Sequence, residues 1–265
     1  MLNMLYALWA YRGFILGTVK REFQIKYRNS LLGAAWNIIN PLAMIVVYTV
    51  IFSQLMRSRL SGIDNGFYGY SIYLCAGTLT WGLFAEIIGR AQNTFIEHAN
   101  LLKKLSFPRL CLPVVVVVNA LINFSITMVL FTAFLLLTHN FPGLVYLSIV
   151  PLLLVLISFA IGLGITLGVL NVFFRDVGQF FSIFIQFWFW FTPIIYPIST
   201  LPDVLQKLMV YNPMSVIISA FQTVLVYRLW PQWDTLLYPI LLAVLFCVLG
   251  LFLFRRHVGE MVDEL

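Results

Sequence analysis

The chain has 265 residues, of which 62% are hydrophobic and only 10% are charged, and its mean hydropathy is +0.96. A water-soluble domain needs more charged residues than this on its surface. The composition therefore indicates a protein that lies in the lipid bilayer. The formal charge of +6 does not indicate nucleic acid, because no basic run alternates with aromatic residues as in a binding groove. Three dispersed cysteines and three isolated histidines support neither a disulfide framework nor a metal site.

The N-terminal segment, residues 1–30, predicts an amphipathic helix in the headgroup region of the membrane. Apolar residues such as Leu16 and Phe23 recur at helical spacing, and basic residues that include Arg21 and Lys26 gather near its end. The alternative is an ordinary basic flank before the first membrane span.

Six apolar segments follow, each long enough to cross a hydrocarbon core of about 30 Å, for which a helix needs roughly 20 residues. The predicted spans cover residues 31–56, 70–89, 110–137, 144–173, 177–196 and 235–254.

The basic residues orient this layout. With the N-terminus inside, twelve of the sixteen Lys and Arg residues fall on the cytoplasmic side and four on the outer side. Basic residues are retained in the cytoplasm, so both termini are predicted there. We therefore expect an all-α integral membrane protein with one permease domain. Its parts are an N-terminal interfacial helix and basic flank (1–30), a six-span bundle (31–254) and a cytoplasmic tail (255–265).

The loop between the second and third spans, residues 89–109, predicts a short cytoplasmic amphipathic helix. Its apolar side chains lie near one face and its charges elsewhere, so the apolar ridge can enter a groove on a soluble partner while the charges set the orientation. A helix resting on the lipid surface is the alternative. The candidate partner contacts are Phe95, Glu97, His98, Asn100, Lys103 and Lys104, together with Arg21 and Lys26.

Small residues lie four apart on the fourth span, at Ala160, Gly164 and Gly168. This spacing allows close approach of helices, either within the chain or between two copies.

The fifth span is almost continuously aromatic, with Gln186 as its one amide. Aromatic faces can pack on the C–H faces of sugar rings, and Trp N–H or Tyr O–H groups can hydrogen-bond hydroxyls. Gln186, Trp190 and Tyr196 are therefore candidate lining residues of a substrate path. An ordinary interfacial belt of aromatic residues is the alternative.

Residues 197–230, on the predicted outer side, contain two short helical pieces. Pro202 and Asp203 interrupt the apolar run, Asn212 can cap the second piece and Pro213 can open it. Neither piece can cross the bilayer alone, so we expect two re-entrant or interfacial helices that form an external gate. A plain external loop is the alternative.

Three separated motifs resemble a known family. They are KREFQIKYRNSLLGAAWNIINP at residues 20–41, NLLKKLSFPR at 100–109, and FRDV at 174–177 with TPIIYP at 192–197. They are similar to the type-2 ATP-binding-cassette permeases that export O-antigen, capsular polysaccharide or teichoic acid, and the resemblance covers nearly the whole chain.

The resemblance implies a homodimeric channel bound to two copies of a separate ATPase subunit. The family's coupling helix would correspond to residues 97–104, its interfacial helix to the N-terminal segment, and its external gate helices to residues 202–226. We expect no catalytic residue here, because no phosphate-binding G-x-x-x-x-G-K-[ST] motif occurs. ATP and Mg²⁺ would bind the partner subunit, with no cofactor on this chain.

The expected function is export of a lipid-linked polysaccharide, such as O-antigen or capsule, across the bacterial inner membrane. The same architecture could instead export a drug, a lipid or a small glycolipid. An ion-coupled transporter needs ionisable groups inside the membrane, and only Glu86 lies clearly within a predicted span. A membrane glycosyltransferase needs clustered carboxylates or metal ligands, whereas the ten acidic residues are dispersed.

Overall fold

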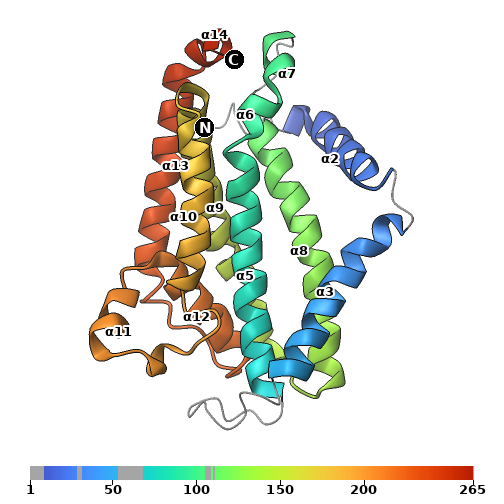
Figure 1. Cartoon of the computed structure of the whole chain (residues 1–265), viewed down its shortest axis with the longest axis vertical. Helices are drawn as coiled ribbons and strands as arrows, with labels where there is room; N and C mark the ends of the chain where they lie inside the picture. Colours follow the sequence, from blue (N-terminus) through green and yellow to red (C-terminus); the bar gives the residue numbers. More distant parts are fainter. Residues whose placement is uncertain (1–8, 29–31, 53–67, 105–108, 110, 265) are drawn as a thin grey trace.

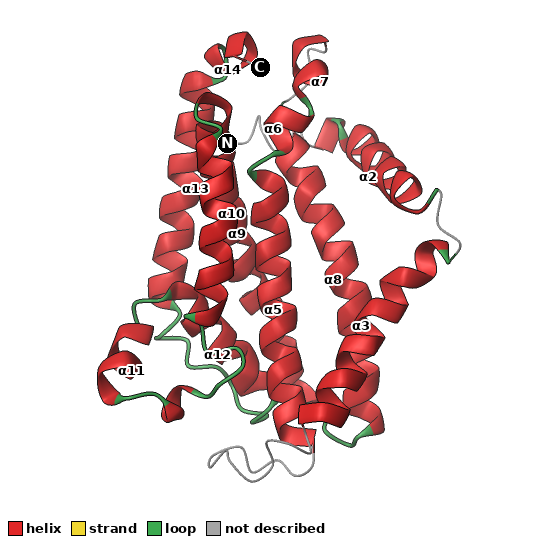
Figure 2. Cartoon of the chain, viewed as in Figure 1, coloured by secondary structure: helices red, strands yellow, loops and turns green. Residues whose placement is uncertain are grey.

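The computed structural model describes residues 9–28, 32–52, 68–104, 109 and 111–264, and every regular element in these ranges is helical (Figure 2). Its α-helices are α2 (Arg12–Tyr27), α3 (Trp36–Val47), α5 (Gly69–Ala91), α6 (Thr94–Glu97), α7 (Ala99–Lys104), α8 (Cys111–Leu137), α9 (Ile149–Phe173), α10 (Asp176–Trp190), α11 (Asp203–Met209), α12 (Pro213–Leu225), α13 (Leu237–His257) and α14 (Glu260–Glu264). The predicted all-α class is confirmed for this part of the chain.

Four of the described helical segments are long and apolar enough to cross a membrane: α5, α8, α13 and Gly143–Phe173, where a 3₁₀ turn leads into α9. They coincide with the predicted second, third, sixth and fourth spans. The helices α11 and α12 are together long and apolar enough to cross, but they are bent by 93°, so the pair is either a fifth, broken span or the re-entrant loop that the sequence predicts.

The structure does not confirm the remaining two predicted spans at full length. For the first, α3 continues into a π-helical turn (Tyr48–Phe52), and residues 31 and 53–56 lie outside the described residues. For the fifth, α10 ends at Trp190 rather than at residue 196, because Pro193 lacks a backbone N–H and its ring obstructs the preceding turn. The count of six spans therefore stays a prediction.

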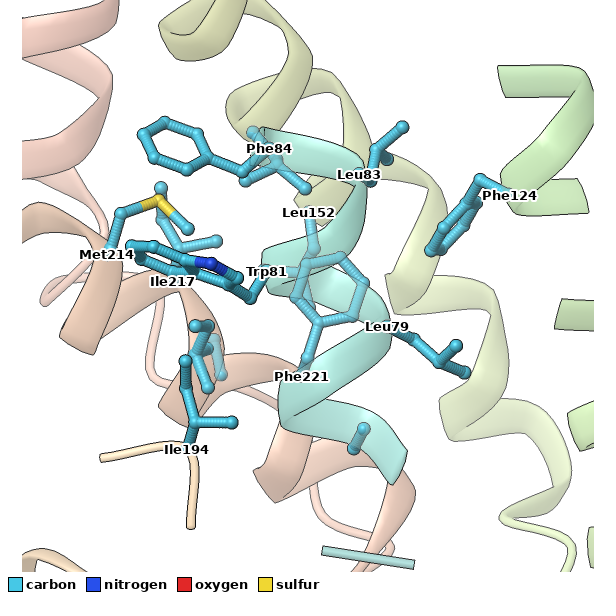
Figure 3. Packing of buried hydrophobic residues seen from close by; sticks show 14 of the residues in the cluster. Leu79, Trp81, Leu83, Phe84, Phe124, Leu152, Ile194, Met214, Ile217 and Phe221 are labelled. Atoms are coloured by element: carbon cyan, nitrogen blue, oxygen red, sulfur yellow. The ribbon is translucent and has the colours of Figure 1, made fainter. Parts of the chain in front are cut away.

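The helix α5 lies at the centre of the bundle, where 72% of its apolar window is buried. Its Trp81 ring lies 6.0 Å from Trp188 of α10, and its Phe84 ring stacks at 5.6 Å on Phe159 of α9. Apolar residues of α12 complete this core (Figure 3). The central helix is thus in contact with both the aromatic helix α10 and the short helix α12.

The helices α9 and α13 cross with their backbones in contact. A Cβ atom at Gly162 would lie 2.6 Å from the backbone nitrogen of Cys247, closer than side-chain atoms pack. The small residues that the sequence predicts for close approach also contact other helices of the same chain. Gly164 lies against Ala91, and Gly168 lies against the Ala91 carbonyl and Phe95. Glycine at these positions therefore serves packing within the chain.

The two ends of the bundle carry different short helices (Figure 1). The helices α2, α6, α7 and α14 lie at one end, called here the coupling end, and α11 and α12 lie at the other, called here the hairpin end. Ile15 and Val19 of α2 pack against the start of α8, whereas Leu16 and Ile25 are more than 60% exposed. Apolar side chains thus project from more than one face of α2. The position of this helix at the membrane interface therefore stays a prediction.

Candidate functional site

The predicted coupling helix is two short helices, α6 and α7, and its apolar residues face inward. Phe95 is fully buried, stacks at 5.4 Å on Phe254 of α13 and touches Gly168 of α9. Leu102 belongs to the same cluster. The apolar ridge expected to enter a partner's groove therefore packs inside this chain, because α9 and α13 extend far enough to cover it.

The polar residues of this region face outward. Glu97, Asn100 and Lys103 are exposed, and His98 is held by a contact of 2.9 Å between its Nδ1 atom and the Thr94 carbonyl. Lys104 ends α7, and its side chain, like that of Lys26, lies outside the described part of the structure. The surface available to a partner is therefore polar.

A cleft of about 300 Å³ brings two predicted segments together at the coupling end. Arg21 of α2 lines it, together with Glu97 and His98. Residues that are 76 or more positions apart in the chain thus share one surface, as expected if α2 and the α6–α7 region contact one partner.

A charged cluster beneath this surface was not expected from the sequence. Arg90 of α5 forms an ion pair with Glu22 of α2, and its guanidinium also lies 3.8 Å from Glu86, one turn earlier on α5. Asn119 of α8 donates a hydrogen bond of 2.9 Å to Glu22, and Asn123 donates one of 2.7 Å to Glu86. The cluster therefore ties α2 to the spans α5 and α8 by charge-assisted bonds.

The same cluster forms the polar floor of an open space. A cleft of about 440 Å³ between α2, α5 and α8 shares Glu86 and Asn123 with a cleft of about 720 Å³ along α3. Each amide nitrogen donates to a carboxylate, whereas the buried Oδ1 atoms of Asn119 and Asn123 have no hydrogen-bond partner among the described residues. In the sequence, this cluster is visible only as two pairs of polar residues, Glu86 with Arg90 and Asn119 with Asn123. The members of each pair lie one helical turn apart in an apolar run.

At the hairpin end, Asn212 organises the turn between α11 and α12. Its Oδ1 atom accepts from the backbone N–H groups of Met214 and Ser215, and Pro213 occupies the first turn of α12, as predicted. Pro202 precedes the exposed Asp203, the first residue of α11. The two short helices predicted in this region are therefore present.

Asn212 also joins this turn to the end of α10. The indole N–H of Trp188 donates to its Oδ1 atom at 3.0 Å, and its own amide nitrogen donates to the Phe191 carbonyl and the Thr192 hydroxyl, both at 3.1 Å. One side chain therefore links α10 to the cap of α12. A change in the position of α10 must strain or break these bonds.

The non-helical segment after α10 is held by neutral hydrogen bonds from α5 and α12. Tyr70 donates to the Ile195 carbonyl at 2.7 Å, and Tyr73 donates to the carbonyls of Pro193 and Tyr196 at 3.1 and 3.0 Å. Gln222 also donates to the Pro193 carbonyl. These carbonyls have no helical partner of their own, so the side chains of α5 and α12 supply the donors that they need.

The aromatic helix α10 has one inner and one outer face. Trp188 and Phe181 pack toward the core, whereas Gln186 and Trp190 are exposed, Trp190 by 63%. Tyr196 is half-buried, and its hydroxyl donates to the Trp190 carbonyl at 2.7 Å. The exposed aromatic stripe of α10 consists of Phe180, Phe184, Phe187, Trp190 and Phe191.

Comparison with known proteins defines the family. A model described as ABC-2 type transporter matches residues 15–226, and the chain belongs to this family. The resemblance predicted from the three motifs is confirmed, and the chain is a membrane component of a transporter.

Curated relatives with the printed name "O-antigen export system permease protein RfbA" match nearly end to end. One from Myxococcus xanthus is 28% identical over 239 residues, 89% of each chain. Two from Klebsiella pneumoniae are 27% identical over 257 residues, 96% of each chain, and 29% identical over 222 residues, 83% of each chain.

Proposed function

We propose that this chain is the membrane subunit of an ATP-driven exporter that moves a lipid-linked polysaccharide, of the O-antigen or capsule type, out of the cytoplasm. The observation that carries the proposal is the exposed aromatic stripe of α10, which runs toward the hairpin end and is not covered by other described helices. Stacked aromatic faces can hold successive sugar rings without reading their linkage. The printed names of the curated relatives support a polysaccharide cargo over a drug or lipid.

Two copies of the chain would place two such stripes around one path. Each copy would bind one ATPase subunit, which supplies the sites for ATP and Mg²⁺. In this arrangement the coupling end faces the cytoplasm of the host, both termini lie there, and the protein is in the inner membrane.

Force from the ATPase would enter through the polar surface of Glu97, Asn100 and Lys103. Phe95 would transmit it to α9 and α13, because its ring is enclosed between them. The Glu22–Arg90 ion pair would carry motion of α2 into α5. At the far end, displacement of α10 would pull on Asn212 and tilt the α11–α12 hairpin. The transport step is mechanical for this chain, with the chemistry on its partner.

The test is deletion of the gene in its host, followed by complementation and measurement of polysaccharide at the cell surface. We expect the deletion to abolish surface polysaccharide and to leave polymer inside the cell. Complementation with Trp190→Ala or Tyr196→Ala should restore less surface polymer than Phe252→Ala, which removes an exposed aromatic ring from α13. Normal surface polysaccharide in the deletion strain would contradict the proposed cargo, and full restoration by both α10-end variants would contradict the aromatic path.

A further inference from the structure

The charged cluster at the coupling end borders a cleft of about 440 Å³, called here the polar cleft. Glu22, Glu86 and Arg90 all line it, so two carboxylates oppose one guanidinium among its described lining residues. The three charged side chains are 30 to 35% exposed. A group that enters the cleft can therefore reach them.

Two amides in the same cleft show that the cluster is short of donors. Asn119 is only 1% exposed and Asn123 is half-buried, and the Oδ1 atoms of both are buried with no hydrogen-bond partner among the described residues. Their amide nitrogens already donate to Glu22 and Glu86. A buried acceptor without a donor is unfavourable. This observation indicates a ligand that brings hydrogen-bond donors, which the acidic residues alone would not.

A longer cleft of about 720 Å³, called here the apolar cleft, continues from the polar cleft between α3, α5 and α8. The two clefts share Glu86 and Asn123. The other lining residues of the apolar cleft are mostly hydrophobic, such as Met44 and Phe124. The cleft follows α5 from Glu86 back to Thr78, a length of about 12 Å at 1.5 Å per residue.

The two clefts together match the polarity of one lipid molecule in a bilayer. The polar cleft lies toward the coupling end, and the apolar cleft extends toward the middle of the bundle, since α5 ends next to α6. Half of a hydrocarbon core is roughly 15 Å thick, close to the length of the apolar cleft. The helices α2 and α3 lie at the edge of the bundle beside α8 (Figure 1), which allows a lipid to enter from the side.

We propose that the joined clefts bind one zwitterionic phospholipid with a primary amine headgroup, such as phosphatidylethanolamine. Its ammonium would donate to Glu22 and Glu86, its phosphate would accept from Arg90, and an acyl chain would fill the apolar cleft. The enclosed Oδ1 atom of Asn119 gains a donor when its amide turns toward the headgroup. A purely anionic headgroup is disfavoured, because it would place negative charge beside two carboxylates. The bound lipid would hold α2 against α5 and α8.

The experiment measures lipid binding to the permease assembled with its ATPase subunit, after removal of lipid in detergent. Native mass spectrometry follows competition between phosphatidylethanolamine and phosphatidylcholine with identical acyl chains. Both lipids are zwitterionic, but the quaternary ammonium of phosphatidylcholine has no N–H to donate. We expect phosphatidylethanolamine to be favoured about tenfold, which corresponds to ~1.4 kcal/mol, close to one charge-assisted hydrogen bond. Equal binding of the two lipids would overturn the proposal.

Two other lipids with the same acyl chains test the chemistry of the headgroup. Phosphatidylglycerol is anionic, and glucosyl diacylglycerol carries neutral hydroxyl donors. We expect each to bind at least about threefold more weakly than phosphatidylethanolamine. If the glucosyl lipid binds as tightly, sugar hydroxyls are sufficient donors and the amine assignment fails. If phosphatidylglycerol binds more tightly, the two carboxylates do not select the headgroup.

The substitution Glu86→Gln locates the headgroup. It removes one negative charge and keeps the shape of the side chain, so the preference for phosphatidylethanolamine should fall from about tenfold to about threefold. Asp234→Asn, at an exposed carboxylate near the hairpin end, is the matched control and should keep the tenfold preference. An unchanged preference in the Glu86 variant would show that the amine binds elsewhere.

The substitution Gly82→Leu locates the acyl chain. Gly82 lines the apolar cleft, and a Cβ atom there meets no other atom within 4 Å, so the larger side chain enters open space. We expect binding of phosphatidylethanolamine to fall about tenfold. Gly89→Leu is the matched control on the same helix, because its Cβ atom also meets nothing within 4 Å and it lines neither cleft.

Two results for Gly82→Leu would overturn the proposal. One is lipid binding equal to that of Gly89→Leu. The other is loss of a second copy of the permease from the complex, since the apolar cleft would then be an interface between copies. The Glu86 variant decides the question if Gly82→Leu does not assemble at all.

The lipid site goes beyond the proposed function and does not depend on the cargo. Lipid competition is measured without polysaccharide, so failure of the export test would leave the site standing. Equal binding of the two zwitterionic lipids would remove the site and leave the export proposal standing.

Discussion

The two ends of the bundle are held together by different chemistry. At the coupling end, α2 is tied to α5 and α8 by two carboxylates, one guanidinium and two amides. At the hairpin end, the segment after α10 is tied to α5 and α12 by the neutral groups of Tyr70, Tyr73 and Gln222. Ion pairs keep much of their attraction when the partners shift by a few tenths of an ångström, whereas neutral hydrogen bonds weaken steeply with misalignment. Under the proposed function, the coupling end would transmit displacement, and the hairpin end would open once displacement is large enough.

The largest effect on stability is expected from removal of Arg90, the arginine that pairs with both carboxylates of the cluster. Arg90→Met leaves Glu22 and Glu86 facing each other, and we expect a loss of about 2 kcal/mol. This is below the ~3 to 5 kcal/mol of a fully buried pair, because the side chains of Arg90 and Glu22 are 35% and 30% exposed. Thermal unfolding of the purified protein in detergent measures it. Arg175→Met, at an exposed arginine, is the control, and equal losses in both variants would contradict the comparison.

At the hairpin end, Asn212→Ala should cost about 1 to 2 kcal/mol, because it removes a helix cap and the contact with Trp188. Asn212→Asp separates the two roles of this side chain. It keeps the oxygen that caps α12 but loses the amide donors to Phe191 and Thr192, so its loss should be roughly half as large. If the aspartate variant is as unstable as the alanine variant, the link to α10 matters more than the cap.

A smaller effect is expected for Tyr73→Phe, which removes only the hydroxyl that binds the carbonyls of Pro193 and Tyr196. The loss should be about 1 kcal/mol, close to that of a typical neutral hydrogen bond. Tyr211→Phe removes the hydroxyl of a ring that is 72% exposed and should leave the unfolding temperature unchanged. Similar shifts in the two variants would show that the hydroxyl of Tyr73 does not hold this segment.

The smallest effect on stability is expected for reversal of the surface charges of the coupling end. Glu97→Lys combined with Lys103→Glu should change stability by less than ~0.5 kcal/mol, since both side chains are exposed. ATPase-coupled transport should nevertheless fall, because under the proposed function these charges orient the partner. Reversal at Asp234, exposed near the hairpin end, is the control. Unchanged transport would contradict the assignment of Glu97 and Lys103 to the coupling surface.

The sequence predicted what depends on local chemistry. Four long apolar runs became helices of membrane-spanning length, and the Asn212–Pro213 pair capped and opened α12 as expected. The end of α10 was predicted wrongly because hydrophobicity was given more weight than Pro193, although the proline was visible.

The charged cluster could not be predicted, because its partners meet only through tertiary packing. Glu22 lies 68 positions from Arg90 and 97 from Asn119. The inward orientation of Phe95 has the same origin, since it depends on where α9 and α13 end relative to α6. The roles assigned to the coupling, path and gate residues stay predictions until transport is measured.

The crossing of α9 and α13 has a consequence for any experiment on motion. At Gly162 the two backbones touch, so no side chains lie between them that could change rotamer and let one helix slide past the other. The two helices should therefore move as one rigid unit during the cycle, so the distance between labels on α9 and α13 stays constant while their distances to α2, α5 and α10 change.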